Sequence, residues 1–217
     1  MLYQIAHAVV SFFAKVFFRL EVVGVEHVPR EGGAILSANH SSYFDIPLLA
    51  CALSRPVDNI AKSELFKNRL IGGFFKKLGA FPIRRGRADR MAIQEAVKRL
   101  KAGHLLSYYP EGTRTKDGGL QKGKSGIGMI VREARVNVVP VYIRGTYQIR
   151  PFRKVTIQFG LPIDFQPEIA EATREKMHPK ILYGRISVKI MTEIASLEKQ
   201  FIGDDLPKKT VQETGRF

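Results

Sequence analysis

The 217-residue chain has a single cysteine, Cys51, so it lacks the cysteine pairs and clusters that a disulfide or a thiolate zinc site needs. It also lacks a repeat of fixed period, a Gly-X-Y pattern and a linker rich in serine or glycine. These absences exclude a disulfide-rich secreted domain, a solenoid, a collagen-like rod and tethered domains. The length predicts one compact domain, and the lone cysteine favours a reducing, cytosolic setting.

Acidic residues are scarce, because 20 Asp and Glu stand against 35 Lys and Arg and give a formal net charge of +15. Residues 62–101 hold twelve basic and three acidic residues, which is more than half of that charge. Such an excess indicates an anionic partner: nucleic acid, anionic lipid headgroups or a phosphorylated substrate. Charge alone leaves these partners open, together with a basic face that only meets solvent.

A long apolar run is also missing. Residues 1–20 are the most apolar stretch, but polar and charged side chains interrupt it: Gln4, His7, Ser11, Lys15 and Arg19. A spanning helix needs about 20 predominantly apolar residues, so the sequence argues against one here. At about 100° per residue the apolar side chains gather on one side, which predicts an amphipathic helix. Its apolar face lies in a membrane interface or packs on its own domain, and both can hold for different parts of the face.

The same stretch has no early positive region and no small-residue cleavage site, so we expect no secretory signal and a protein of the cytoplasm.

After residue 20, strand-like and helical segments alternate. The expected strands are 21–25, 33–38, 57–61, 80–83, 104–109, 138–143 and 155–159, and the expected helices are 45–53, 65–78, 89–102, 125–134 and 173–201, the last with a break near Pro179. Alternation of this kind predicts an α/β fold, a single layered domain with a largely parallel or mixed sheet flanked by helices. We divide the chain into an amphipathic membrane-interface helix (1–20), one main domain large enough for an enzyme (21–202) and a polar tail (203–217).

The first candidate site lies in residues 39–45, which follow an expected strand. His40 ends that strand and Asp45 begins the next helix. Ligands gather at such strand ends in α/β sheets. An aspartate at this spacing can bond one imidazole nitrogen and leave the other free as a base. A helix-capping aspartate beside an unrelated histidine gives the same pattern, so this signal is weak by itself.

The second candidate site is residues 109–115, again just past a strand. It supplies an acid, Glu111, a flexible Gly112 and a guanidinium, Arg114. The planar fork of arginine matches a phosphate bidentately, so this loop is suited to a phosphorylated substrate. The alternative is a polar turn held by an internal pair between Glu111 and Arg114.

Together these segments resemble the glycerolipid acyltransferases, specifically the 1-acyl-glycerol-3-phosphate (lysophosphatidic acid) acyltransferases. Residues 39–47 resemble the first block of that family, the His-x4-Asp motif, and residues 79–85, 110–115 and 138–141 resemble the second to fourth blocks, in family order. Residues 61–65 are similar to the lysine-bearing segment between the first two blocks. The second block commonly reads Asp-Arg where this chain has Arg84 and Arg85, which leaves Arg85 in the arginine position.

The resemblance implies that His40, oriented by Asp45, is the general base for the hydroxyl of a lysophospholipid. That hydroxyl would attack the thioester of acyl-CoA or acyl carrier protein directly, so no acyl-enzyme forms and Cys51 is expected in the core. The resemblance further implies a substrate-binding set of Lys62, Arg85, Glu111, Gly112, Thr113 and Arg114. It implies no metal and no cofactor besides the acyl donor, an anionic membrane surface as partner, no nucleic acid, and a peripheral or monotopic place on the cytoplasmic face.

Other readings remain open from the sequence. Residues 118–125 match the phosphate-loop pattern of nucleotide hydrolases, although residues 110–117 separate them from the preceding strand, which is the wrong context. A non-enzymatic basic protein is the other class, but we find no recognition helix, and we expect Phe74 and Phe75 in the core. We expect structural roles for the remaining histidines: His7, His27, His104 and His178. Within the family, glycerol 3-phosphate and lyso-ornithine lipid stay open as acceptors, and so does the acyl chain length.

Overall fold

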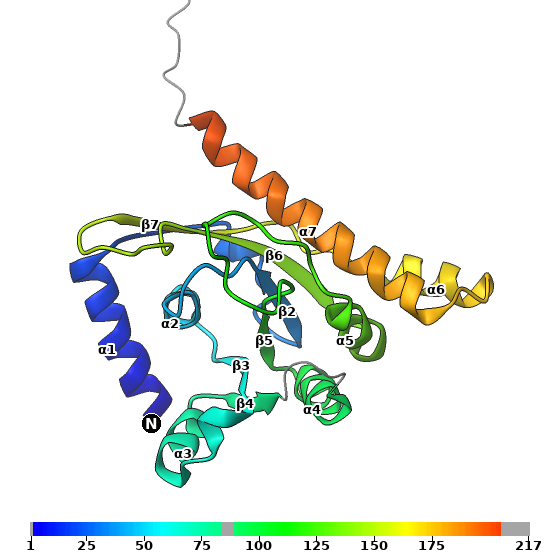
Figure 1. Ribbon diagram of the computed structural model, residues 1–217, viewed down its shortest axis with the longest axis horizontal. Coiled ribbons are helices and arrows are strands. Elements are labelled where there is room, and N and C mark those ends of the chain that lie inside the picture. The colour runs from blue at the N-terminus through cyan, green and yellow to red at the C-terminus, as the bar shows by residue number, and fades with distance from the viewer. Residues whose placement is uncertain (1, 84–88, 205–217) are drawn as a thin grey trace, which may run out of the picture.

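The computed structural model describes residues 2–83 and 89–204, and within them the chain builds one seven-stranded sheet (Figure 1). The strand order is β1-β7-β6-β2-β5-β3-β4. The strands are β1 (Arg19–Val23), β2 (Ala34–Ala38), β3 (Val57–Lys62), β4 (Ala80–Ile83), β5 (Leu105–Tyr108), β6 (Asn137–Arg144) and β7 (Lys154–Phe159). Only the pair of β6 and β7 is antiparallel among these neighbours. The predicted α/β fold with a mixed sheet is therefore confirmed.

Helices cover both faces of the sheet. They are α1 (Leu2–Phe17), α2 (Asp45–Cys51), α3 (Arg69–Lys77), α4 (Arg90–Lys101), α5 (Gly126–Ala134), α6 (Gln166–Arg174) and α7 (Pro179–Asp204), with short 3₁₀ turns η1 (Val25–His27) and η2 (Ser63–Phe66). One apolar core lies under α1 and α2, and a second joins α4, α5, α6 and α7. Because α2 and α3 make crossovers in the same direction along the sheet, they share a face, and Figure 1 shows α1, α2 and α3 on one side.

Helix α1 confirms the predicted amphipathic helix but packs on α2 through its more polar face. The His7 Nε2–H donates to the Leu53 carbonyl at 3.2 Å, the Tyr3 hydroxyl accepts from the Val57 N–H at 3.3 Å, and Ala14 is buried. The apolar face points away from the domain, where the side chains of Phe12 and Phe13 are 64% and 50% exposed. The part of the face that holds the phenylalanines therefore does not pack on the domain, while Leu2 and Ala6 of the same face are half-buried.

The link from α1 into the sheet is short. Only Phe18 separates α1 from β1, so β1 begins earlier than the predicted residue 21. The Phe152 N–H donates to the Phe17 carbonyl at 2.6 Å, and the Arg19 N–H donates to the Arg153 carbonyl at 3.3 Å. The end of α1 is thus held against the segment that leads into β7.

The expected break near Pro179 is present, because α6 ends at Arg174, Lys176 takes a left-handed φ of 52°, and Pro179 starts α7, although α6 begins at Gln166 rather than at residue 173. Two expectations need correction. Helix α7 runs to Asp204, past the expected domain end, and residues 205–217 of the expected tail lie outside the described residues. The segment 65–78 is split into η2 and α3, because the Asn68 side chain accepts from the Leu70 and Ile71 N–H groups and starts a new helix.

Three residues expected in the core are less buried than that. Phe74 is exposed and Phe75 half-buried, since the buried position of α3 is Gly72, which lies against the backbone of Phe66. Cys51, at the end of α2, is half-buried. The four histidines each have a structural partner: His7 and His27 bond backbone carbonyls, His104 bonds Asp58, and His178 accepts from a backbone N–H.

Helix α5 approaches α7 so closely that a side chain on Gly128 has no room. A Cβ there would lie 2.4 Å from the Tyr183 Cα and 2.7 Å from the Tyr183 carbonyl oxygen. Gly184, one residue further along α7, has no atom within 4 Å of a built Cβ. Position 128 therefore has no room for a side chain, whereas position 184 of the same helix pair has open space around it.

We predict that Gly128→Ala lowers the free energy of unfolding by about 1–3 kcal/mol, because the helices must move apart. The matched control Gly184→Ala should raise it by about 0.5–1 kcal/mol, because alanine favours a helix interior. Thermal unfolding followed by circular dichroism measures both. Equal melting temperatures for Gly128→Ala and the wild type would contradict the close contact.

Candidate active site

Several of the sequence motifs lie at one edge of the sheet, where parallel strands end. Strand β2 lies between β6 and β5, and its Ser37 pairs with Pro140 on one side and Tyr108 on the other. The His40 segment follows β2 and the Arg114 segment follows β5, so both begin at the same edge. The fourth block, residues 138–141, lies in β6 beside β2 and is buried.

The Asp45 carboxylate holds the first motif. Its Oδ2 accepts from His40 Nδ1 at 2.8 Å, from the Ser41 N–H at 2.7 Å and from the Ser42 N–H at 2.8 Å. Both His40 and Asp45 are buried. Because an ionised carboxylate only accepts, Nδ1 carries the imidazole proton and Nε2 keeps its lone pair. The predicted pairing of His40 and Asp45 is present, with a nitrogen left available for a proton.

The backbone around His40 is tied to both neighbouring segments. The Thr115 N–H donates to the His40 carbonyl at 2.8 Å, which joins the second motif to the first. On the other side, the Asn39 side chain bonds the backbone of Ile143 twice, donating at 2.9 Å and accepting at 2.7 Å. These bonds continue the ladder between β2 and β6 past the end of β2, so the histidine is held in place from both sides.

The ring of Tyr109 stacks on the imidazole of His40. Their centroids are 4.2 Å apart and their planes differ by 28°. Burial raises the pKa of the Tyr109 hydroxyl well above its ordinary value, and the charge of Asp45 adds to this, so the phenol stays neutral. Our sequence reasoning missed this contact. The contact arises because β2 and β5 pair in parallel, which brings the residues after both strands together, and no local sequence pattern signals it.

The second motif forms a turn that separates its carboxyl group, on Glu111, from its guanidinium, on Arg114. Gly112 has a φ of 71°, which favours glycine, and its N–H donates to the Tyr109 carbonyl at 3.0 Å. The Arg114 guanidinium carbon lies 3.5 Å from the centroid of the Tyr43 ring, a residue of the first motif. Within the described residues Glu111 makes no ion pair with Arg114 but is buried, so the alternative of an internal Glu–Arg pair is wrong.

Glu111 points inward beside the histidine segment. Burial raises the pKa of this carboxyl to about 7, the backbone N–H groups of His40 and Gln121 lower it in part, and the charge of Asp45 raises it again. Among the described residues neither carboxyl oxygen reaches a partner at ordinary hydrogen-bond geometry. A Cβ on Gly112 would lie 3.0 Å from Lys124 Nζ, so a further cation stands by this turn.

The other expected binding residues lie further out. Lys62 is exposed at the end of β3, two strands from β2 and thus about 10 Å across the sheet. Thr113 is exposed, and its hydroxyl donates to the Arg114 carbonyl at 3.4 Å. Arg85 lies outside the described residues. In the described part of the chain, no three His, Cys, Asp or Glu side chains gather as metal ligands.

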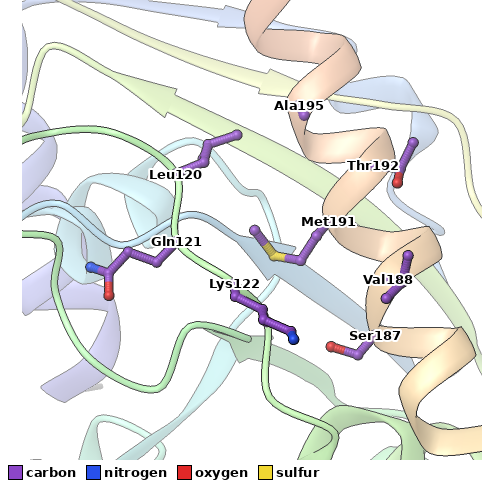
Figure 2. A pocket seen from close by; sticks show the side chains of 9 residues that line it. Leu120, Gln121, Lys122, Ser187, Val188, Met191, Thr192 and Ala195 are labelled. Carbon is purple, nitrogen blue, oxygen red and sulfur yellow. The ribbon is translucent and has the colours of Figure 1, made fainter. Parts of the chain in front are cut away.

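A cavity of about 260 Å³ lies between the loop after the second motif and α7 (Figure 2). Met191 of α7 points toward this loop, and Leu120 and Val188 add apolar walls. His40, Asp45 and Arg114 do not line it. The stretch 118–125 beside it does not follow a strand directly, since β5 ends at Tyr108. This separation argues against a nucleotide-binding phosphate loop.

A buried histidine–aspartate pair beside an arginine-bearing turn, at the carboxyl edge of an α/β sheet, is an arrangement suited to general-base chemistry. The chain belongs to the Acyltransferase family, whose model matches residues 19–144. That range contains the histidine pair and the arginine turn.

Three relatives are 30–32% identical to this chain over the regions that align. A 1-acyl-sn-glycerol-3-phosphate acyltransferase of Bacillus subtilis is 32% identical over 58% of this chain and 63% of the relative. One from Streptococcus pneumoniae is 30% identical over 80% and 64%, and a chloroplast one from Arabidopsis thaliana is 31% identical over 62% and 38%. The matches thus span less than two thirds of these relatives.

A solved structure is similar over most of the fold. It is the 1-acyl-sn-glycerophosphate (LPA) acyltransferase PlsC from Thermotoga maritima, with 28% identity and a TM-score of 0.66. The match covers 90% of this chain and 81% of that one. None of the described helices combines the length and the apolar character needed to cross a bilayer.

We predict that stability depends on pH through Glu111. Its pKa is about 7 when folded, above its ordinary value of 4.5, so between these pH values the folded chain holds a proton that the unfolded chain has lost. This favours folding at low pH, and the benefit disappears as pH rises through 7. The free energy of unfolding of the wild type should therefore fall by about 1–2 kcal/mol relative to Glu111→Gln between pH 4.5 and 8, a figure reduced for solvent screening.

Urea unfolding at the two pH values measures this difference. Glu193→Gln, at an exposed position on α7, is the control and should follow the wild type at both. A difference between wild type and Glu111→Gln that does not change with pH would show that this carboxyl is not protonated on folding.

Proposed function

We propose that the chain is a 1-acylglycerol-3-phosphate O-acyltransferase, which moves a fatty acyl group from an acyl thioester to 1-acyl-glycerol 3-phosphate and makes phosphatidic acid. The observation that carries this proposal is the buried pair of His40 and Asp45, whose free Nε2 lies at the same sheet edge as Arg114. The names of the relatives and of the similar structure support the same substrate.

The chemistry needs one base and no covalent enzyme intermediate. His40 Nε2 takes the proton of the acceptor hydroxyl while its oxygen attacks the thioester carbonyl. A carbon–oxygen bond forms, the carbon–sulfur bond breaks, and the proton passes from the imidazolium to the departing thiolate. Asp45 holds the ring and stabilises the imidazolium through the Nδ1 bond. The Tyr109 ring limits the imidazole to one orientation.

The phosphate of the acceptor is assigned to the second motif. The Arg114 guanidinium is fixed against Tyr43, so its fork can meet a phosphate with little loss of side-chain freedom. Glu111, Gly112 and Thr113 shape this turn, and Lys62 and Arg85 are the further cations of the proposal. Acyl-CoA or acyl carrier protein is the donor, and the reaction as written uses no metal and no other cofactor.

The proposed place of work is the cytoplasmic face of an anionic membrane, with the chain bound as a peripheral or monotopic protein. The outward-facing apolar side of α1 supports this, because Phe12 and Phe13 meet water unless a lipid surface covers them. The net charge of +15 supports an anionic surface. A membrane substrate and a membrane-bound enzyme would then meet at one surface.

We predict that His40→Ala lowers kcat by about 10²–10⁴, the usual contribution of a positioned base. The assay follows acyl transfer from a long-chain acyl-CoA, and separately from acyl carrier protein, to lysophosphatidic acid, to glycerol 3-phosphate, to lyso-ornithine lipid or to no acceptor. Cys51→Ala is the matched control and should keep wild-type activity, because the thiol takes no part. More than about a tenth of wild-type activity in His40→Ala would refute its role as base, and product with another acceptor alone would replace the proposed substrate.

We predict that Arg114→Lys raises KM for lysophosphatidic acid by about tenfold and changes KM for the acyl donor much less. Lysine keeps the charge but loses the two-pronged contact and the stacking on Tyr43. Steady-state kinetics with each substrate varied in turn gives both values. Arg132→Lys, on α5, is the control, and equal changes in the two KM values of Arg114→Lys would remove the phosphate role.

A further inference from the structure

Helix α3 and the residues before it combine cations with large apolar side chains. Residues 67–77 read KNRLIGGFFKK and contain no acidic residue. The four cations are Lys67, Arg69, Lys76 and Lys77, and they flank the apolar residues at both ends. This composition is that of a short interfacial helix, which needs an apolar face for the acyl boundary and cations for anionic headgroups.

The structure turns the apolar side of α3 away from the domain. Leu70 is 85% exposed, and Ile71 and Phe74 are 49% and 46% exposed. At about 100° per residue these three side chains fall within one arc of about 100°, and Gly72 falls on the opposite side. A Cβ on Gly72 would lie 2.9 Å from the Phe66 Cα, so the helix reaches η2 through its glycine rather than through its large side chains.

Helix α3 lies on the same face of the sheet as α1. Both helices expose their large apolar residues and contact the domain through smaller ones: Ala14 in α1 and Gly72 in α3. In Figure 1 the N-terminal end of α1 lies toward α3, with α2 on the same side. Tyr43 and Phe44, which lead into α2, are exposed as well.

We infer that α3 is a second membrane-docking element, in which the four cations bind the phosphates of anionic lipids while Leu70, Ile71 and Phe74 enter the interface. The occupant is an anionic bilayer because exposed apolar side chains and clustered cations occur together on one short helix. This inference rests on the proposed attachment of α1 to a membrane. It adds a second contact, which places the carboxyl edge of the sheet and its His40 at the bilayer surface.

The test uses the full chain and vesicles of phosphatidylcholine, with and without phosphatidylglycerol, in a flotation assay. Leu70→Gln with Phe74→Gln should weaken binding by about tenfold or more, because two apolar side chains lose their burial. Lys76→Gln with Lys77→Gln should weaken binding to the anionic vesicles by about fivefold per lysine and leave the weak binding to neutral vesicles unchanged. Circular dichroism and thermal unfolding confirm that each variant is folded.

The matched control is Met91→Gln with Val188→Gln. These side chains are 79% and 62% exposed, and they lie on α4 and α7, which cover the other face of the sheet. This control should bind vesicles like the wild type. Wild-type binding by both α3 variants would overturn the inference. Analytical ultracentrifugation measures the oligomeric state of the same variants. If their oligomeric state changed while their vesicle binding did not, the inference would also be overturned, because α3 would then contact a second copy of the chain.

Two further arms separate this inference from the proposals above. Phe12→Gln with Phe13→Gln tests α1 alone. Wild-type vesicle binding by this variant would refute the attachment of α1 and, because the inference rests on it, the role of α3 as a second contact. Acyl transfer to a detergent-dispersed acceptor should be unchanged in the α3 variants, whereas transfer on vesicles should fall with binding. Vesicle binding that depends on α3, in a protein with no acyl transfer at all, would support the docking role and refute the proposed reaction.

Discussion

One carboxylate oxygen, Oδ2 of Asp45, organises the site. It accepts three hydrogen bonds, from the imidazole of His40 and from the N–H groups of Ser41 and Ser42. Those two backbone groups belong to the turn from β2 into α2, so the same atom closes the turn and orients the ring. Leaving any of these buried groups unpaired would cost about 1–3 kcal/mol. The turn, the histidine and the start of α2 therefore depend on one another, and none can shift alone.

The two helices α1 and α3 reverse the usual rule for helices on a soluble domain. Ordinarily the apolar stripe faces the core and the polar side faces water. Here the inner side of α1 holds Tyr3 and His7, which bond the backbone after α2 and at the start of β3, and the buried Ala14. Helix α3 contacts η2 through Gly72, while phenylalanine and leucine side chains of both helices point outward. Small residues on the inner side allow this, since backbones can approach where no large side chain intervenes. The hydropathy pattern is the same in either orientation, so the contacts decide which way it faces.

Local patterns in the sequence predict the sheet and the His40–Asp45 pair, because alternation and a five-residue spacing are properties of short segments. The stacking of Tyr109 on His40 and of Arg114 on Tyr43 depends on two strands far apart in the chain becoming neighbours, which no local pattern contains. Glu111 was expected in the binding loop, and its inward direction follows from the tight turn at Gly112. Phe74 was misplaced for a similar reason: its periodicity fits a buried stripe, but Gly72 occupies the contact.

The one-residue connection between α1 and β1 has a consequence for how the chain would leave a surface. With the Phe17 carbonyl held by the Phe152 N–H, the helix has no flexible tether to the sheet. Once α1 is bound, α3 therefore meets the same surface as part of a rigid body, and its binding is intramolecular, with a high effective concentration. Release requires both contacts to open together. The second helix would then lengthen the residence time on the membrane far more than it would speed the first encounter.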